Sequence, residues 1–137
     1  MYYSFSITTE KDVDEGDPTK TELKLTAGII ILVRIRNHKG NRGTLHLRLF
    51  KGGHCIWPQN PDGDFLGDGI DLSWTEFYEV KKDDNILVAH TWNDSDVYAH
   101  ECIVDFAILP RWVALPLLIG QGISSTLSQL IGAVKEL

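Results

Sequence analysis

Short apolar segments that alternate with polar residues recur along most of this chain, and they constrain the fold more than any other feature. Tyr3, Phe5 and Ile7 alternate with serine and threonine, which is the period-two pattern of a half-buried β-strand. The same alternation returns in 45–50 and in 97–109. Clusters of Gly, Pro, Asn and Asp separate such segments and favour turns. The pattern therefore predicts a succession of strands, each with one side facing a core.

We expect strands at 3–8, 23–37, 45–50, 54–57, 70–80, 86–92 and 97–109. The turn formers of 37–43 predict a hairpin between the second and third of these strands, and 93–96 predicts another between the last two. The second hairpin would bring His90 near His100. The acidic segment 10–19 and the segment 58–69 are expected to be irregular loops, because their composition cannot bury apolar surface.

No helical pattern precedes residue 110, so the sequence predicts an all-β fold over residues 1–109. The expected architecture is a two-sheet antiparallel β-sandwich, immunoglobulin-like or jelly-roll-like. The length of 137 residues fits one compact domain. One side of the last strand should face the core. Its two sides carry Tyr98, Cys102, Val104, Phe106 and Ile108, and Val97, Ala99, Glu101, Ile103 and Asp105.

The composition changes after Pro110, because Trp112 to Val134 contains no charged residue. The apolar spacing within the C-terminal segment 110–137 predicts an α-helix from about residue 121. Small residues at four-residue steps beside this apolar stripe allow close approach of another backbone. We expect this helix to dock onto copies of the chain or onto a partner through Gly120, Ile123, Ser124, Leu127, Ser128, Leu130, Ile131, Gly132 and Val134.

The net charge of −6 disfavours nucleic-acid binding. The uncharged segment is long enough to cross a bilayer, but its Gln, Ser, Thr, Gly and Pro residues make it a poor membrane span. The first residues lack the features of a signal peptide, which predicts synthesis in the cytoplasm. Cys55 and Cys102 fall on different strands and could meet across the sandwich, although free thiols are favoured in that compartment.

Motifs for common catalytic sites are missing: the sequence holds no H-E-x-x-H, C-x-x-C, G-x-S-x-G or Walker-type motif. We therefore expect a protein that is not an enzyme. Asp and Gly cluster in the loop around residue 65, a composition that suits Ca²⁺ coordination and is equally typical of turns. The candidate calcium ligands are Asp62, Asp64, Asp68 and Asp71.

Two further residue sets are candidates for ligand binding. Flat aromatic faces suit a sugar ring, although tryptophan is more often packed in a core; the four are Trp57, Trp74, Trp92 and Trp112. Basic residues gather around the first predicted hairpin and could bind a carboxylate or phosphate, although outward-facing strand positions explain them equally well. These are Arg34, Arg36, Lys39, Arg42, Arg48 and Lys51.

The apolar run 28–37, the turn after it and the alternating run 44–53 resemble the core of immunoglobulin-like and fibronectin-III-like modules. The resemblance extends over about residues 20–109. His100 stands two residues before Cys102, where immunoglobulin domains have a tyrosine. The resemblance implies a sandwich and no particular function.

Together these features predict a structural or assembly protein that forms homo-oligomers through its C-terminal helix, as a virion or filament component does. The alternative is a ligand-binding module that recognises carbohydrate or depends on Ca²⁺.

Overall fold

The computed structural model describes residues 1–60 and 63–118. These residues form strands and one helix with the following bounds: β1 (Tyr2–Thr9), β2 (Thr19–Lys24), β3 (Gly28–Asn37), β4 (Leu45–Lys51), β5 (His54–Trp57), β6 (Phe65–Leu66), β7 (Asp71–Val80), β8 (Ile86–Asn93), β9 (His100–Leu109) and α1 (Arg111–Leu118).

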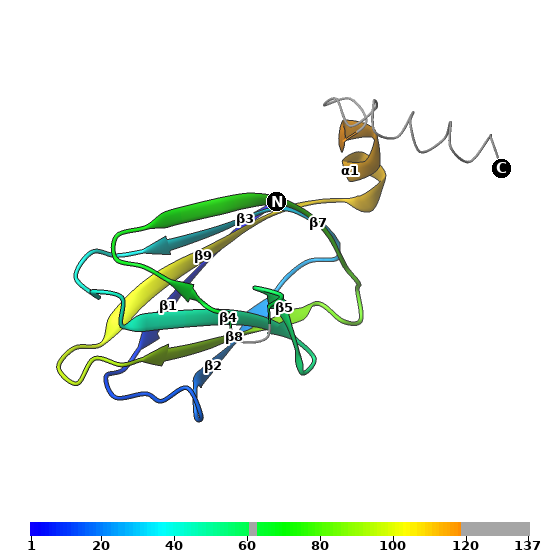
Figure 1. The fold of residues 1–137 in the computed structure, drawn as a ribbon. Helices are drawn as coiled ribbons and strands as arrows, with labels where there is room; N and C mark the ends of the chain where they lie inside the picture. Colours follow the sequence, from blue (N-terminus) through cyan, green and yellow to red (C-terminus); the bar gives the residue numbers. More distant parts are fainter. Residues whose placement is uncertain (61–62, 119–137) are drawn as a thin grey trace.

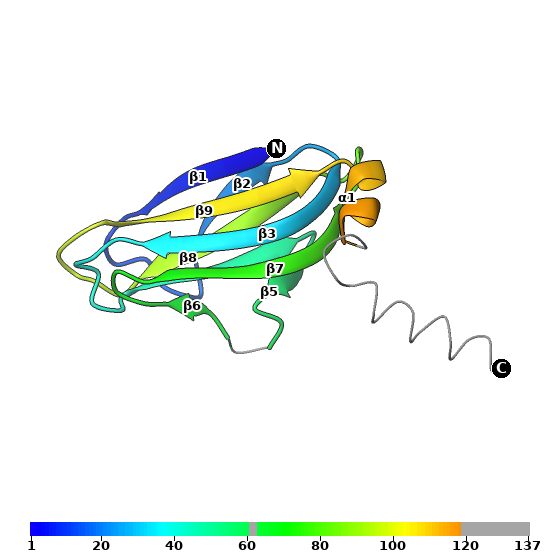
Figure 2. The same ribbon diagram turned by 90° about the horizontal axis from the view of Figure 1, so that it is seen from above.

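The strands form two antiparallel sheets that pack face to face (Figure 1). Sheet A has the order β1-β9-β3-β7, and sheet B has the order β2-β8-β4-β5 with β6 beside β4. Figure 2 shows the strands of sheet A side by side, with α1 at one end of the sandwich. The predicted all-β, two-sheet antiparallel sandwich is therefore confirmed.

Most connections carry the chain from one sheet to the other. β1, β3, β7 and β9 lie in sheet A, whereas β2, β4, β5 and β8 lie in sheet B. With the two-residue β6 set aside, this interleaving is the strand order of a jelly roll, which folds two Greek keys into two sheets. In the immunoglobulin order the first two strands share a sheet, but β1 and β2 do not. The strand order thus matches the jelly-roll alternative of the predicted fold class.

Both predicted hairpins are wrong, for one physical reason. β3 and β4 lie in different sheets, and so do β8 and β9. The loops 38–44 and 94–99 are long enough to cross between sheets, and their turn-forming residues suit a crossing as well as a hairpin. His90 consequently does not lie on a strand paired with that of His100; its cross-strand neighbours are Lys20 and Arg48.

The single strand predicted at 23–37 is two strands in different sheets. The chain leaves sheet B after Lys24 and enters sheet A at Gly28. Asn85 stabilises this crossing with two hydrogen bonds. Its side-chain amide donates to the main-chain carbonyl of Leu25 (2.7 Å), and its main-chain carbonyl accepts from the main-chain amide of Leu25 (2.9 Å). The segment 58–69 also differs from the prediction, since it contains β6.

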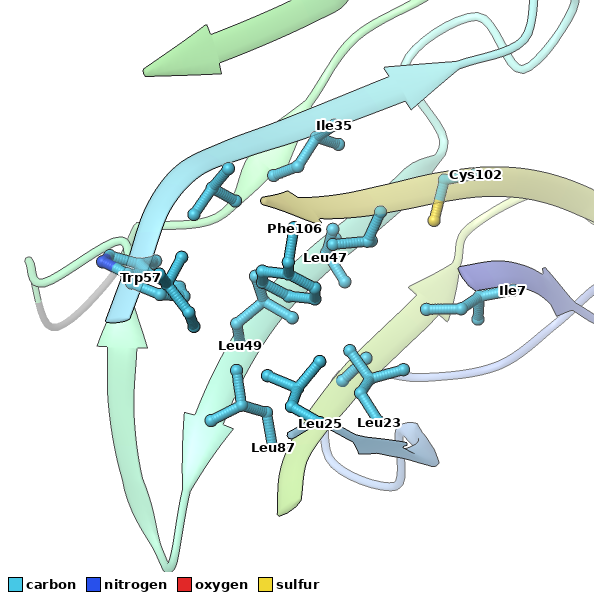
Figure 3. Close-up of a cluster of buried hydrophobic side chains, with 14 of the residues drawn as sticks. Ile7, Leu23, Leu25, Ile35, Leu47, Leu49, Trp57, Leu87, Cys102 and Phe106 are labelled. Atoms are coloured by element: carbon cyan, nitrogen blue, oxygen red, sulfur yellow. The ribbon is translucent and has the colours of Figure 1, made fainter. Parts of the chain in front are cut away.

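The core lies between the inner faces of the two sheets (Figure 3). Phe106 of β9 packs there among the leucines of β4, and both Phe106 and Leu49 are fully buried. The alternation predicted for β9 is confirmed at the fully buried Cys102, Val104, Phe106 and Ile108. It is wrong at Tyr98, which precedes the strand and is exposed. Cys55 and Cys102 are free thiols, and burial raises the pKa of Cys102 to about 12.

Helix α1 begins directly after Pro110, earlier than the helix predicted from about residue 121. The Pro110 carbonyl accepts hydrogen bonds from the amides of Val113 and Ala114. The helix contacts β3, and Ala114 is fully buried while Trp112 is 77% exposed. The predicted helix itself lies outside the described residues. No helix in residues 1–60 and 63–118 is long and apolar enough to cross a membrane.

The placement of the core predicts that replacing phenylalanine by alanine changes the free energy of unfolding by different amounts at two positions. Phe106→Ala should lower the free energy of unfolding by about 3–5 kcal/mol, because it removes a fully buried ring and leaves a cavity. Phe77→Ala on β7 should cost less than about 1 kcal/mol, since Phe77 is half exposed. Urea unfolding followed by tryptophan fluorescence measures both, and equal losses would contradict the placement of the core.

Candidate functional site

A hollow of about 230 Å³ lies on the outer face of sheet B, over the neighbouring strands β2, β8 and β4. The acidic loop that precedes β2 contributes part of the wall of the hollow. The hollow is lined by Glu15, Pro18, Lys20, Arg48, Phe50, His90 and Trp92.

The core fixes which side chains face this hollow. Leu47 and Leu49 of β4 point into the sandwich, so Arg48 and Phe50 point outward. The strand register places Lys20 opposite His90 and His90 opposite Arg48. One row across three strands therefore carries three basic side chains.

Aromatic stacking holds the walls of the hollow in place. The Phe50 and His90 rings stack with their centroids 3.9 Å apart, and the Arg48 guanidinium lies 5.4 Å from the Phe50 centroid. The neighbouring Trp92 stacks on His46 at 5.0 Å. A cation beside an aromatic face is attracted by the ring quadrupole. These contacts orient Arg48 without neutralising its charge.

The charge of the hollow is only partly balanced. Lys20 and Arg48 form no ion pair within the described part of the chain. The Arg48 Nε atom is buried and has no hydrogen-bond partner there. Burial, together with the positive charges of Lys20 and Arg48, lowers the pKa of His90 below its ordinary value. His90 is therefore neutral at neutral pH, and the hollow presents two cations and the carboxylate of Glu15.

The candidate calcium ligands are directed to different partners. Asp64 lies 3.1 Å from the Nδ1 atom of His46, whose Nε2 atom lies 2.7 Å from Asp94. Asp68 accepts a hydrogen bond from the Gly40 amide at 2.7 Å. Asp71 accepts one from Arg34 Nε at 2.8 Å.

No group of three or more His, Cys, Asp or Glu residues in 1–60 and 63–118 is placed to hold a metal ion. Asp62 lies outside the described residues, so calcium binding stays a prediction.

The strand residues of the predicted basic cluster are divided between the two sheets, and the others lie in the loop 38–44. Arg34 pairs with Asp71 and Arg36 with Asp105 on sheet A. Arg48 faces the hollow on sheet B. The reason is again that β3 and β4 lie in different sheets, so the cluster does not form one surface.

The tryptophans do not form a shared sugar platform. Trp57 and Trp92 are buried and Trp112 is exposed on α1. The indole N–H groups of Trp57 and Trp74 both donate to Glu76 Oε1, at 3.1 and 3.0 Å. Among the four, Trp92 lines the hollow. The residues of the predicted C-terminal interface, 120–134, lie outside the described part of the chain.

Asp105 is a charged residue that the sequence analysis did not single out. It is 1% exposed although it lies on the outer face of sheet A. Its Oδ2 atom lies 3.0 Å from Arg36 Nε, and its Oδ1 atom accepts a hydrogen bond from Arg36 Nη2 at 3.2 Å. Burial raises the pKa of Asp105, but hydrogen bonding to Ser4, Arg36 and Tyr2 and the charge of Arg36 outweigh it, so the pKa is lowered.

No family model matches this chain, and no curated protein matches it. Several solved structures have a similar chain path, among them the following three. The capsid asymmetric unit of cyanophage Pam1 has a TM-score of 0.39 and 12% identity over 79% of this chain and 82% of that chain. A crystal structure of PirA has a TM-score of 0.35 and 18% identity over 77% and 94%. Bacillus endospore appendages, described as disulfide-linked pili, have a TM-score of 0.31 and 12% identity over 80% and 88%. Likeness at this level assigns no function, so function is argued from this chain's own residues.

Asp105 makes the stability of the fold dependent on pH. Its pKa is lower in the folded chain than the value of about 3.9 in an unfolded one. Its contribution is therefore complete above that value and is lost as the pH falls through the folded pKa. Asp105→Asn should lower the free energy of unfolding at pH 7 by about 1–3 kcal/mol and flatten its decline below about pH 4.

Urea unfolding at a series of pH values measures this effect. Asp83→Asn is the matched control, because Asp83 is exposed and forms no ion pair within the described residues. If both variants had the same pH profile as the unsubstituted chain, Asp105 would not have the assigned role.

Proposed function

We propose that this chain is a non-enzymatic assembly module, in which the jelly-roll sandwich presents an apolar C-terminal segment that binds copies of the chain. The observation that supports this proposal is Trp112, which is 77% exposed on α1. It stands at the start of a run to Val134 that contains no charged residue.

The sandwich already encloses its own core. Ile7 of β1, Leu49 of β4 and Phe106 of β9 are buried among other strand residues. Of the α1 side chains at 111–114, only Ala114 is fully buried. Burying an apolar segment between chains favours association, because it removes apolar surface from water.

The spacing of small residues supports a close helix contact. Gly120, Ser124, Ser128 and Gly132 recur every four residues beside the apolar stripe, and such a stripe lets two helices approach closely. A contact between identical segments would give a symmetric homo-oligomer. Membership of a virion or filament would follow if these contacts propagate.

Ligand binding by the sandwich is the second candidate function. The hollow on sheet B favours it, because a concave site with converging polar groups is the usual form of a ligand site. Jelly rolls occur in both capsid and lectin domains, so the fold is compatible with either function. Calcium binding by the loop around Asp64 belongs to this second candidate.

Removal of the C-terminal segment should separate the assembly from the sandwich. The full chain should form oligomers, whereas a version ending at Arg111 should be a monomer with a cooperative unfolding transition. Size-exclusion chromatography with light scattering measures the mass, and thermal unfolding reports whether the shortened chain is folded. A full chain that stays monomeric at high concentration would contradict the assembly role.

Substitutions within the full chain test the contact itself. Ser124→Leu and Ser128→Leu together should weaken association at least about tenfold, because larger side chains separate the helices. Ser125→Leu is the control, since Ser125 lies next to this stripe of small residues but not in it. Sedimentation at several concentrations gives the association constants, and equal effects of the two changes would argue against close packing along the stripe.

A further inference from the structure

We propose that the hollow on the outer face of sheet B binds the carboxylate of a small acidic sugar, of the uronic-acid class. Arg48 and Lys20 pair with the carboxylate, while the aromatic and neutral polar groups around them contact the sugar ring. The inference is independent of the assembly role, because the hollow and the C-terminal segment share no residue.

The charges around the hollow favour an anion with a single charge. Lys20 and Arg48 contribute two positive charges and Glu15 one negative charge, which leaves a net charge of about +1 at the hollow in a chain of net charge −6. A carboxylate balances this local charge, whereas a dianionic phosphate would exceed it. Arg48 also has the planar donor geometry that matches a carboxylate.

The neighbours of Arg48 orient its guanidinium for binding a carboxylate. Its guanidinium lies over the Phe50 ring at 5.4 Å, and its Nε atom is buried without a hydrogen-bond partner in the described residues. Because the Nε atom itself is buried, an incoming carboxylate meets the outer guanidinium nitrogens, and Arg48 forms no ion pair in the described residues that would compete for them. Because the stacked Phe50 and His90 rings fix the surroundings, little ordering is needed on binding.

The size and the lining of the hollow favour a ring-shaped ligand. Its volume of about 230 Å³ lies just below the range of about 300–1,000 Å³ that is typical of sites for drug-sized ligands, which favours a ligand as small as one sugar ring. Phe50 and Trp92 provide apolar wall for the C–H face of a ring. Neutral His90 has one donor and one acceptor nitrogen for hydroxyl groups, which suits a sugar better than an aliphatic acid.

Replacing Glu15 should change the affinity for an anion in the opposite direction to replacing Arg48 or Lys20. Its carboxylate lines the same hollow on an exposed loop, so it repels a bound anion. Glu15→Gln should therefore tighten binding, whereas Arg48→Gln and Lys20→Gln should weaken it. Lys24→Gln is the matched control, because Lys24 lies on the same face of β2 but not at the hollow.

Binding is measured on the full chain by ligand-observed saturation-transfer NMR with D-glucuronate, D-glucose and inorganic phosphate. We expect glucuronate to bind with a Kd of about 1 mM, and glucose and phosphate at least about tenfold more weakly. Arg48→Gln and Lys20→Gln should each raise the Kd for glucuronate about tenfold, Glu15→Gln should lower it about threefold, and Lys24→Gln should leave it unchanged. Urea unfolding checks that each variant is folded. If Arg48→Gln does not fold, Lys20→Gln still tests the site, because Lys20 is exposed and its replacement should not disturb the fold.

Three results would overturn the proposal. Absence of saturation transfer at about 20 mM glucuronate would exclude the site. Equal weakening by Lys20→Gln and Lys24→Gln would reduce the effect to general surface charge. Phosphate binding as tightly as glucuronate would show recognition of an oxyanion without the sugar ring.

Discussion

The burial of alternate side chains between the two sheets is the interaction on which the rest of the structure depends. Leu47 and Leu49 of β4 pack against residues of the opposite sheet, among them Phe106. Because successive strand residues face opposite sides, the same burial turns Arg48 and Phe50 to the outer face of sheet B. The basic row across β2, β8 and β4 is therefore positioned by the core, and the outer surface depends on the same register.

The two outer faces differ in how their charges are satisfied. On sheet A, Arg34 pairs with Asp71 and Arg36 with the buried Asp105, so this face satisfies its own charges and links neighbouring strands. On sheet B, Lys20 and Arg48 have aromatic neighbours and form no ion pair within the described residues. The ion pairs of the first face link its strands, whereas Lys20 and Arg48 on the second face are the cations to which the proposed anion would bind.

The sequence predicted the faces of the strands better than their partners. Period-two alternation separated the two sides of β9 from Cys102 to Ile108, because burial acts on each strand by itself. Alternation does not reveal which sheet a strand joins, so both predicted hairpins were wrong and the basic residues were assigned to one surface. The hollow was missed for the same reason, since Lys20, Arg48 and His90 are distant in sequence and meet only through the strand register. The one sequence feature that these three residues share is a polar position that alternates with buried residues of its strand, and it does not show that the strands are neighbours.

The central claim is that the sandwich folds as a unit and leaves the uncharged C-terminal segment for contacts between chains. Hydrogen exchange of the full chain at low and at high protein concentration tests it most directly. Amides in β3, β4, β9 and α1 should exchange slowly at both concentrations, whereas amides in 119–134 should become protected only as the concentration rises. Equal protection of 119–134 at the lowest and the highest concentration would mean that these residues do not depend on contacts between chains, and would contradict the claim.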